Sequence, residues 1–286
     1  MRFRASIENV PTFSKIMQSI EKLSKTCTIR LTEETIRIIC NTANEGGVQV
    51  WSQIRIPTIF SEYRIESNAN NEITLVLATE ALLHVLKSAI SSPEVMVKLA
   101  KRNNVACLSF DIVTQTKQGK KVQIAHDVKI VIMKPTEAEL LKEPLCPEPD
   151  VHIVLPPLQK LRTVVERLRS LSDVVGIFAN GSGQLKLAIQ TERIKSDTLW
   201  TGLTNPVMRE PEPAEEHDHD PEEFHAVLIS ARSLLKFLTA HVIANTTIAC
   251  ICARHCIILY VYIGSVGEPG GVLTFYLPAI LDEDED

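Results

Sequence analysis

Three cysteines and a histidine near the end of the chain are the residues whose types most readily suggest chemistry. Cys250, Cys252, His255 and Cys256 all belong to the residue types that bind zinc. Their spacing is not that of a recognised zinc finger, and Cys250 and Cys252 lie two apart in a strand-like segment, so they point to one face. Buried thiols that act as small apolar residues explain this pattern better. We therefore expect no metal site here.

Other candidate groups also fail to form a catalytic pattern. His217 and His219 lie in an acidic stretch that offers adventitious metal binding but no organised site. His126 and Asp127 are adjacent in a predicted strand and must face opposite sides. Gly181-Ser182-Gly183 is a turn, and no G-x-x-x-x-G-K-[ST] loop is present. The sequence predicts no enzyme and no cofactor. A two-domain metal-dependent hydrolase is the alternative from another class, and stoichiometric zinc in purified protein would favour it.

Basic side chains recur on the predicted exposed faces of helices. They are Lys15, Lys22, Lys25, Lys87, Lys160, Arg162, Arg167, Arg169, Arg232 and Lys236. Lysine and arginine that contact phosphates give affinity for nucleic acid without reading its bases. The plainer interpretation is that solvent-facing helices usually carry charge, and Glu166 in the middle of one such face dilutes the basic pattern.

The overall charge hides two different kinds of sequence. The 286 residues carry a net charge of −5, but residues 209–223 and 282–286 are strongly acidic. Without them, 22 of the 35 acidic and 29 of the 30 basic residues remain, a net charge of +7. A basic body is compatible with a polyanionic partner. The two acidic segments have few apolar side chains, so we expect them to be disordered.

Cysteine usage and apolar runs indicate the compartment. The seven cysteines, an odd number, come with no secretory signal, which favours free thiols in a reducing compartment. No apolar run approaches the roughly 20 residues that a membrane span needs. We expect an intracellular protein with no membrane partner.

Four amphipathic helices are predicted among many short strands. Helices are expected at Val10–Lys25, at Glu80–Ser91 with Thr79 as its cap, at Leu158–Leu171, and after the cap Ser230. The expected inward faces include Ile90 and Leu171. The predicted strands are Arg2–Ile7, Cys27–Leu31, Thr35–Cys40, Val48–Ile54, Phe60–Glu66, Glu72–Leu77, Val95–Ala100, Val105–Val113, Val122–Ile132, Val151–Leu155, Val174–Ala179, Gln184–Gln190, Ile194–Trp200, Phe224–Ile229, Thr247–Cys252, Ile257–Ile263 and Val272–Leu277.

The second half of the chain repeats the order of the first. Its two helices match the first two in phase at shifts of about 148 and 152 residues, which favours an internal duplication. The proline-rich segment 134–150 predicts an extended, stiff connector. We therefore predict an α+β protein with domains 1–133 and 151–281, an acidic insert at 209–223 and an acidic tail at 282–286. Each half has only two helices, and two helices can cover only one face of its sheet.

Short motifs recur along the whole chain, among them Phe3-Arg4-Ala5, Gly46-Gly47-Val48, Asn70-Asn71-Glu72-Ile73, Leu203-Thr204-Asn205-Pro206 and Phe275-Tyr276-Leu277-Pro278-Ala279. These motifs resemble the sliding clamps, the family of the proliferating cell nuclear antigen, and within it the Hus branch of the nine-one-one checkpoint clamp. Each motif is short, and their order and spacing together carry the resemblance. The acidic insert and the acidic tail depart from the family pattern and look peripheral to it.

The resemblance implies duplicated DNA-clamp (processivity-fold) domains, with antiparallel sheets outside and helices that line a central channel. It implies a heterotrimeric ring with two other checkpoint-clamp subunits, joined through edge strands, here Val122–Ile132 and Ile194–Trp200. The ring would enclose double-stranded DNA, be loaded by an ATP-driven clamp loader, and recruit repair and signalling proteins in the nucleus, with a cytoplasmic pool allowed. An outer groove for partner peptides would involve Leu140, Leu141, Tyr276 and Pro278. A homotrimeric replicative clamp is the alternative.

Overall fold

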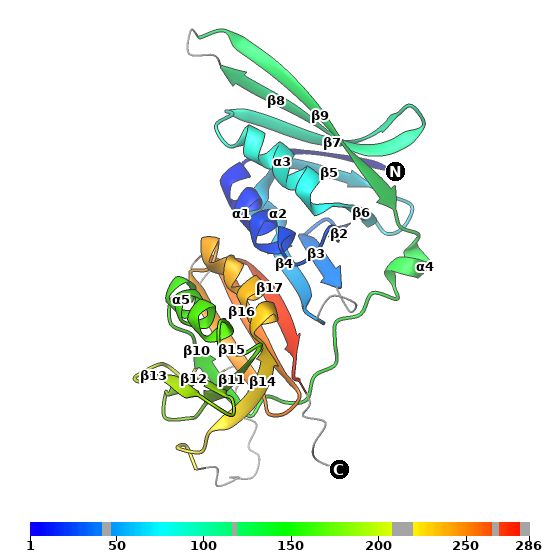
Figure 1. Cartoon of the computed structure of the whole chain (residues 1–286). Helices are drawn as coiled ribbons and strands as arrows, with labels where there is room; N and C mark the ends of the chain where they lie inside the picture. Colours follow the sequence, from blue (N-terminus) through cyan, green and yellow to red (C-terminus); the bar gives the residue numbers. More distant parts are fainter. Residues whose placement is uncertain (42–46, 116–118, 208–219, 265–268, 281–286) are drawn as a thin grey trace. The chain divides into compact units, whose positions relative to one another are not determined.

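The computed structural model describes residues 1–41, 47–115, 119–207, 220–264 and 269–280 (Figure 1). These residues form two compact units. Unit 1 comprises Met1–Asn41, Val50–Glu143 and residues 269–273. Unit 2 comprises residues 47–49, 144–207, 220–264 and 274–280. Most of the predicted acidic insert and the whole acidic tail lie outside the described residues, so their predicted disorder stays a prediction.

Unit 1 is built on antiparallel strands in the order β4-β3-β2-β6-β9-β8-β7-β1-β5. The long strand β9 pairs with β8 over its first part and with β6 over its last three residues. Alternation places one side chain in two in the core, as in Phe3, Ala5 and Ile7 of β1. The strands are β1 (Arg2–Ile7), β2 (Thr26–Leu31), β3 (Thr35–Asn41), β4 (Gln49–Arg55), β5 (Phe60–Glu66), β6 (Ile73–Ala78), β7 (Glu94–Arg102), β8 (Val105–Gln115) and β9 (Lys121–Ile132).

Two helices of unit 1, α1 (Val10–Glu21) and α3 (Thr79–Ala89), pack against each other. Asn9 begins α1, because its side-chain oxygen accepts a hydrogen bond from the Thr12 amide at 3.1 Å. The apolar stripe of α1 is buried as its 3.6-residue period predicts. Two single turns, α2 (Ile56–Ile59) and α4 (Pro135–Ala138), were not predicted.

Unit 2 contains two antiparallel sheets. One has the order β10-β15-β16-β17 and the other has the order β13-β12-β11-β14. Glycine-rich residues 180–183 join β11 to β12 in the turn that the sequence predicts. The strands are β10 (Val151–Val154), β11 (Val174–Ala179), β12 (Leu185–Gln190), β13 (Lys195–Trp200), β14 (His225–Ser230), β15 (Thr246–Cys252), β16 (Cys256–Gly264) and β17 (Pro269–Pro278), of which residues 274–278 belong to this unit.

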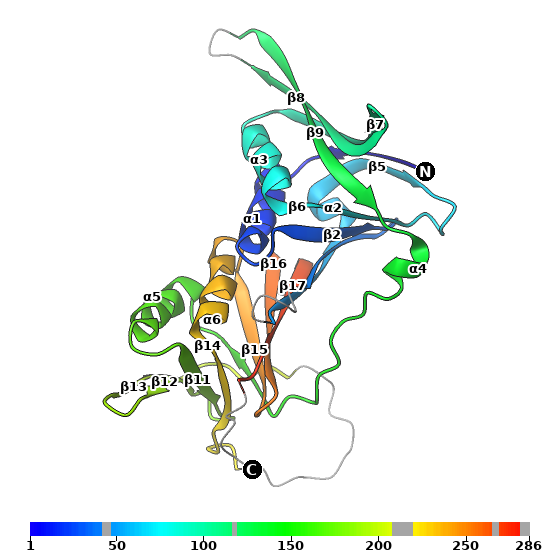
Figure 2. The same cartoon turned by 45° about the vertical axis from the view of Figure 1, so that its right-hand side comes forward.

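The helices of unit 2 form a second packed pair. Helix α5 (Leu158–Arg169) packs against α6 (Ala231–Phe237) and the short 3₁₀ helix η1 (Leu238–Val242) that continues it (Figure 2). Ser230 caps α6 as predicted, because its hydroxyl accepts from the Ser233 amide at 3.4 Å.

The helices repeat at the shifts that the sequence predicts. Helices α1 and α5 are both 12 residues long and start 148 residues apart. Helices α3 and α6 begin at Thr79 and Ala231, 152 residues apart. The buried positions correspond as well, so Val10, Phe13, Met17 and Ile20 match Leu158, Leu161, Val165 and Leu168. Each unit therefore contains the same helical pattern on strands of the same antiparallel kind.

Helix ends are where the sequence predictions were wrong. Thr79 is the first helical residue of α3 rather than its cap, and its hydroxyl donates to the Ser24 carbonyl oxygen at 2.6 Å. Ile90 and Leu171 were expected inward, but they lie past the ends of α3 and α5 and are 46% and 48% exposed. The predicted helices were extended too far because apolar periodicity does not show where a helix ends.

The segment between the repeats is only partly extended. It begins with the helical turn α4, while residues 141–149 have no regular secondary structure. The boundary between the two units falls at Glu143 and Pro144, inside this segment. The exact domain limits 1–133 and 151–281 stay a prediction. None of the helices in the described part of the chain is long and apolar enough to cross a membrane.

Candidate nucleic-acid interface and partner groove

Helix α1 presents basic side chains on or near its exposed side. Lys15 is exposed in the middle of the helix and forms no ion pair with another described residue. Lys22 caps the helix, and its ammonium nitrogen lies 3.1 Å from a carboxylate oxygen of Glu21. Lys25 is exposed but lies beyond the end of α1. The expectation that Lys25 belongs to a helix is therefore wrong, because α1 ends at Glu21.

Helix α3 exposes His84, Lys87 and Ser88 opposite its buried leucines. The Ser88 hydroxyl oxygen lies 3.2 Å from Nε2 of His126 on strand β9. The rings of His84 and His126 meet edge to face with their centroids 6.4 Å apart. This polar cluster ties the exposed face of α3 to β9.

A hollow of about 860 Å³ lies beside this cluster, lined by the end of α1, the exposed side of α3 and strand β9. Asp127 in its lining also pairs with Arg102, with 3.6 Å between Nε and Oδ2. His126 and Asp127 thus have different partners, Ser88 for the histidine and Arg102 for the aspartate. The charges of the lining residues balance, because the basic Lys22, Lys87 and Lys129 are matched by the acidic Glu21, Glu80 and Asp127.

Helix α5 carries the densest group of basic residues. Lys160, Arg167 and Arg169 are exposed. Nε of Arg162 lies 2.8 Å from the carboxylate of Glu166 one turn later, so this arginine is already neutralised. Arg167 and Arg169 lie in the last turn, where a positive charge also stabilises the helix dipole. Part of this basic pattern therefore stabilises the helix itself.

Helix α6 adds two further basic residues. Arg232 is exposed in its first turn, and Lys236 is half-buried in its last turn. Neither forms an ion pair with another residue in the described part of the chain. Seven of the ten predicted phosphate-contacting residues therefore lie on helices and are unpaired among the described residues. They are Lys15, Lys87, Lys160, Arg167, Arg169, Arg232 and Lys236.

Each unit also has a strand with an open edge. Residues 121–129 of β9 pair only with β8 among the described strands, and β13 pairs only with β12. Both segments carry exposed apolar side chains, among them Val122, 38% exposed, and Leu199, 50% exposed. An open strand edge with apolar side chains is suited to pairing with another strand. Of the two strands named from the sequence, β13 is at the edge of its sheet, whereas β9 lies between β8 and β6 and is open on one side only over residues 121–129.

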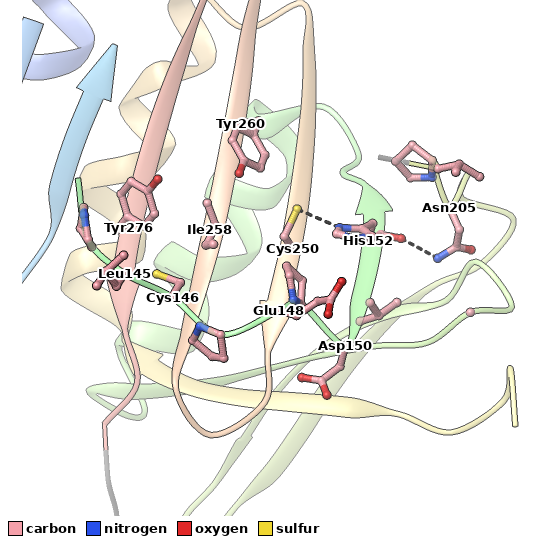
Figure 3. A pocket seen from close by; sticks show the side chains of 17 residues that line it. Leu145, Cys146, Glu148, Asp150, His152, Asn205, Cys250, Ile258, Tyr260 and Tyr276 are labelled. Carbon is pink, nitrogen blue, oxygen red and sulfur yellow. Dashed lines mark hydrogen bonds between the residues drawn. The ribbon is translucent and has the colours of Figure 1, made fainter. Parts of the chain in front are cut away.

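Unit 2 contains a groove of about 890 Å³ (Figure 3). The connector segment 144–150 forms one wall, and side chains of β15, β16 and β17 form the floor, including Ile258, Tyr260 and Tyr276. Asn205, Pro206 and Val207 line the groove near strand β10. Leu145 on the connector is 97% exposed and Val207 is 82% exposed, so two large apolar side chains stand unburied at its rim.

Hydrogen bonds hold the walls of the groove in place. The backbone amide of Asp150 donates to the Ile251 carbonyl at 2.9 Å, and the Asp150 carboxylate accepts from the Ala253 amide at 2.7 Å. Asn205 donates from Nδ2 to the carbonyl oxygens of His152, at 2.7 Å, and Asn180, at 3.0 Å. The connector and the 205–207 loop are thus tied to the sheets.

A histidine and a cysteine meet at the groove, with 3.1 Å between Nδ1 of His152 and Sγ of Cys250. Burial raises the pKa of the Cys250 thiol to about 12, and nearby Cys252 contributes to the same shift. Burial also lowers the pKa of His152, although Glu148 opposes the shift. At neutral pH both groups are therefore uncharged. A cysteine nucleophile needs the opposite arrangement, with a thiolate stabilised by an imidazolium.

The three cysteines considered as zinc ligands are buried thiols, as the sequence predicts. Cys250, Cys252 and Cys256 are buried, and all seven cysteines are free. The described residues contain no group of three or more histidine, cysteine, aspartate or glutamate side chains placed to hold a metal ion. His217 and His219 lie outside the described residues.

Only one of the four predicted groove residues lines this groove. Tyr276 lies on its floor, whereas Leu140 and Leu141 belong to unit 1 and Pro278 is exposed at the end of β17. Sequence reasoning did not single out His152 or Leu145. The alternation in Val151–Val154 is the signal that could have placed His152 on the side of β10 away from the core.

Comparisons with known proteins identify the family. The Hus1-like protein family matches residues 1–281 of the chain. Checkpoint protein hus1 of Schizosaccharomyces pombe is 33% identical over 291 residues, which covers 99% of this chain and 100% of the relative. Checkpoint protein HUS1 of Homo sapiens is 32% identical over 256 residues, 87% of this chain and 90% of the relative.

A solved structure confirms the fold. The crystal structure of Proliferating Cellular Nuclear Antigen from Entamoeba histolytica superposes with a TM-score of 0.73 at 14% sequence identity, covering 98% of this chain and 99% of that protein. At this identity the likeness shows the fold alone, and it confirms the predicted clamp architecture with antiparallel sheets and few helices. This chain belongs to the Hus1-like family of checkpoint proteins and has the fold of a sliding clamp.

Proposed function

We propose that the chain is a non-enzymatic subunit of a heterotrimeric ring that encloses double-stranded DNA. The ring would act as a scaffold for proteins of the DNA-damage checkpoint. The observation that carries this proposal is the repeated pair of packed helices, each with unpaired lysines or arginines on its exposed side. Exposed cations at these positions suit sequence-independent contacts with phosphates. Enclosure by a ring would hold the DNA, so each contact can stay weak and let the ring slide.

The two open strand edges support a ring. Strands β9 and β13 belong to different units and each lacks a second partner along much of its length among the described residues. Head-to-tail pairing of β9 in one subunit with the counterpart of β13 in the next would satisfy both edges. The resemblance of the sequence to the checkpoint branch of the sliding clamps favours two different checkpoint-clamp subunits as the neighbours.

The proposal also assigns loading and recruitment to other proteins. The sequence contains no phosphate-binding loop for ATP, so an ATP-driven clamp loader would open and close the ring. The groove of unit 2, with Leu145, Val207 and Tyr276, would receive segments of repair and signalling proteins. Work on damaged chromosomes would place the subunit in the nucleus.

The experiment is a measurement of mass in solution by light scattering. The chain alone is expected at its monomer mass of 31.9 kDa, and with the two other checkpoint-clamp subunits it is expected in a complex of one copy each. A trimer of about three times that mass from the chain alone would favour a homotrimeric replicative clamp instead. A chain that stays monomeric in the mixture would contradict both forms of ring.

Two matched variants test the edge itself. Leu199→Lys places a charge on the open strand β13, whereas Leu171→Lys changes a leucine of nearly equal exposure, 48% against 50%, just after α5. Loss of the complex with Leu199→Lys and its retention with Leu171→Lys is the expected result. Equal behaviour of the two variants would show that β13 is not at the subunit interface.

A further inference from the structure

Three thiols meet beside the groove of unit 2. Cys252 and Cys256 face each other as the last pair of the β15–β16 hairpin. The Cys256 thiol hydrogen-bonds the thiols of both Cys252 and Cys146. Cys146 comes from the connector, so one of the three belongs to a different part of the chain from the other two.

The connector holds Cys146 at this place. Prolines lie close to it at positions 144 and 147, which stiffens the segment. The Cys252 thiol donates to the carbonyl oxygen of Pro147 at 3.5 Å, and Asp150 is hydrogen-bonded to Ile251 and Ala253 of the hairpin. The position of Cys146 beside the hairpin is thus fixed on its carboxyl side.

Exposure distinguishes Cys146 from the other cysteines. All seven cysteines lie in the described part of the chain, and six of them are buried, while Cys146 is half-exposed and lines the groove (Figure 3). A water-borne oxidant therefore reaches this thiol first, and a second thiol stands in contact with it. An accessible thiol beside a resolving thiol is the arrangement of oxidation-sensitive cysteines.

We propose that Cys146 and Cys256 form a peroxide-sensitive modification site, in which oxidation links the connector to the β15–β16 hairpin by a disulfide. Hydrogen peroxide transfers one oxygen to the sulfur of Cys146, so an S–O bond forms, the O–O bond breaks and one water leaves. The sulfur of Cys256 then attacks the sulfenic sulfur, the S–O bond breaks, and the oxygen leaves as a second water. In total, two thiols and one peroxide give one disulfide and two waters.

Cys252 accepts a hydrogen bond from Cys256 but takes no part in the bond that forms. The hydrogen bonds that Cys256 donates to Cys252 and Cys146 raise its pKa, so Cys256 attacks as the thiol. The proton that Cys256 loses leaves with the sulfenic oxygen as part of the second water. The resulting bond would fix the connector wall of the groove, because Cys146 is part of that wall. The inference concerns the chain alone and does not depend on ring formation.

The experiment treats the full chain, fully reduced, with hydrogen peroxide, then blocks free thiols and maps disulfides by mass spectrometry. A peptide pair joined through Cys146 and Cys256 is expected, reversible by dithiothreitol. Cys146→Ser and Cys256→Ser should each abolish this pair. Cys252→Ser should still form the pair, because Cys252 takes no part in the bond.

The chain contains its own control in Cys27 and Cys40. These two thiols also hydrogen-bond each other, across β2 and β3, but both are buried and neither is next to an exposed thiol. They should stay reduced under the same treatment. A bond between Cys252 and Cys256 with Cys146 still free, overoxidised Cys146 without a disulfide, or equal oxidation of the Cys27 pair would each overturn the proposal.

Discussion

Nδ1 of His152 lies 3.1 Å from Sγ of Cys250 at the edge of the groove in unit 2. Both groups are uncharged at neutral pH, because burial lowers the pKa of the imidazole and raises that of the thiol. A neutral pair of this kind stabilises the local structure and has none of the reactivity of a thiolate–imidazolium pair. Because the imidazole is neutral only in the folded protein at mildly acidic pH, the stability of the protein should depend on pH.

The stability of the protein should fall as the pH falls below about 6.5, the ordinary value for histidine. In the unfolded chain the residue takes up a proton near that pH, whereas in the folded protein the lowered pKa of His152 keeps the ring neutral to lower pH. The unfolded state then binds more protons, so protonation favours unfolding. His152→Gln should flatten the dependence of the urea midpoint on pH on the acid side of neutrality.

The same substitution at His255 serves as the control, because this histidine is exposed on the turn between β15 and β16. It distinguishes the effect of burial from the simple loss of one histidine. An unchanged slope in His152→Gln would show that the neutral pair with Cys250 does not contribute to the acid sensitivity.

Asn205→Asp should destabilise the protein by about 1 to 3 kcal/mol, the range for buried hydrogen-bonding groups that are left unsatisfied. The amide nitrogen of Asn205 donates to two backbone carbonyls, those of His152 and Asn180. A carboxylate of the same shape would place its charge against both oxygens. Denaturation in urea measures the difference in the free energy of unfolding.

Asn245→Asp is the matched control for this effect. Its amide donates a single bond, to the Gly264 carbonyl at 3.0 Å, and the pair is exposed. The cost there should stay below about 1 kcal/mol, the net worth of an ordinary hydrogen bond. Similar destabilisation of the two variants would mean that the two hydrogen bonds donated by Asn205 contribute no more to stability than a single exposed one.

Leu168→Ala and Leu171→Ala should differ sharply although they are three residues apart. Leu168 is 4% exposed on the inner face of α5, and its truncation leaves a cavity that costs about 2 to 5 kcal/mol. Leu171 is 48% exposed beyond the last residue of the helix, so its truncation should cost well under about 1 kcal/mol. Chemical denaturation of both variants tests where α5 ends. Equal costs would place Leu171 in the core after all.

Removal of the positive charges of Lys15 and Lys87 together should weaken the binding of duplex DNA and reduce its salt dependence. Each lysine that no longer neutralises a phosphate makes the slope of log K against log salt shallower by about 0.9. Both side chains are exposed on helices and unpaired among the described residues. Binding of the assembled complex to a DNA duplex, measured at several salt concentrations with both lysines changed to alanine, gives the slope.

Arg37→Ala is the control for charge alone. Arg37 is exposed on strand β3 instead of on a helix, and it stands opposite Arg30 on β2. Its removal should leave the slope unchanged. A decrease equal to that of the lysine variant would indicate a general effect of net charge and contradict a helix-lined DNA surface.

The sequence by itself determined the fold class, the repeat and the main elements. The apolar periods of α1 and α5 placed both helices in phase, because a buried stripe must recur every 3.6 residues whatever its neighbours are. Buried strands such as β11 followed from their short apolar runs. The same local patterns could not show that α1 ends at Glu21, because a helix stops where its packing stops.

The tertiary structure alone decided which distant residues meet. Cys146 and Cys256 are 110 positions apart, and His152 and Cys250 are 98 apart, so no local pattern relates them. The groove, its hydrogen-bonded walls and the neutral state of the His152–Cys250 pair all depend on strands β10, β15 and β16 lying side by side. Burial in that sheet changes the pKa values and brings the thiols together, and burial is a property of the folded chain.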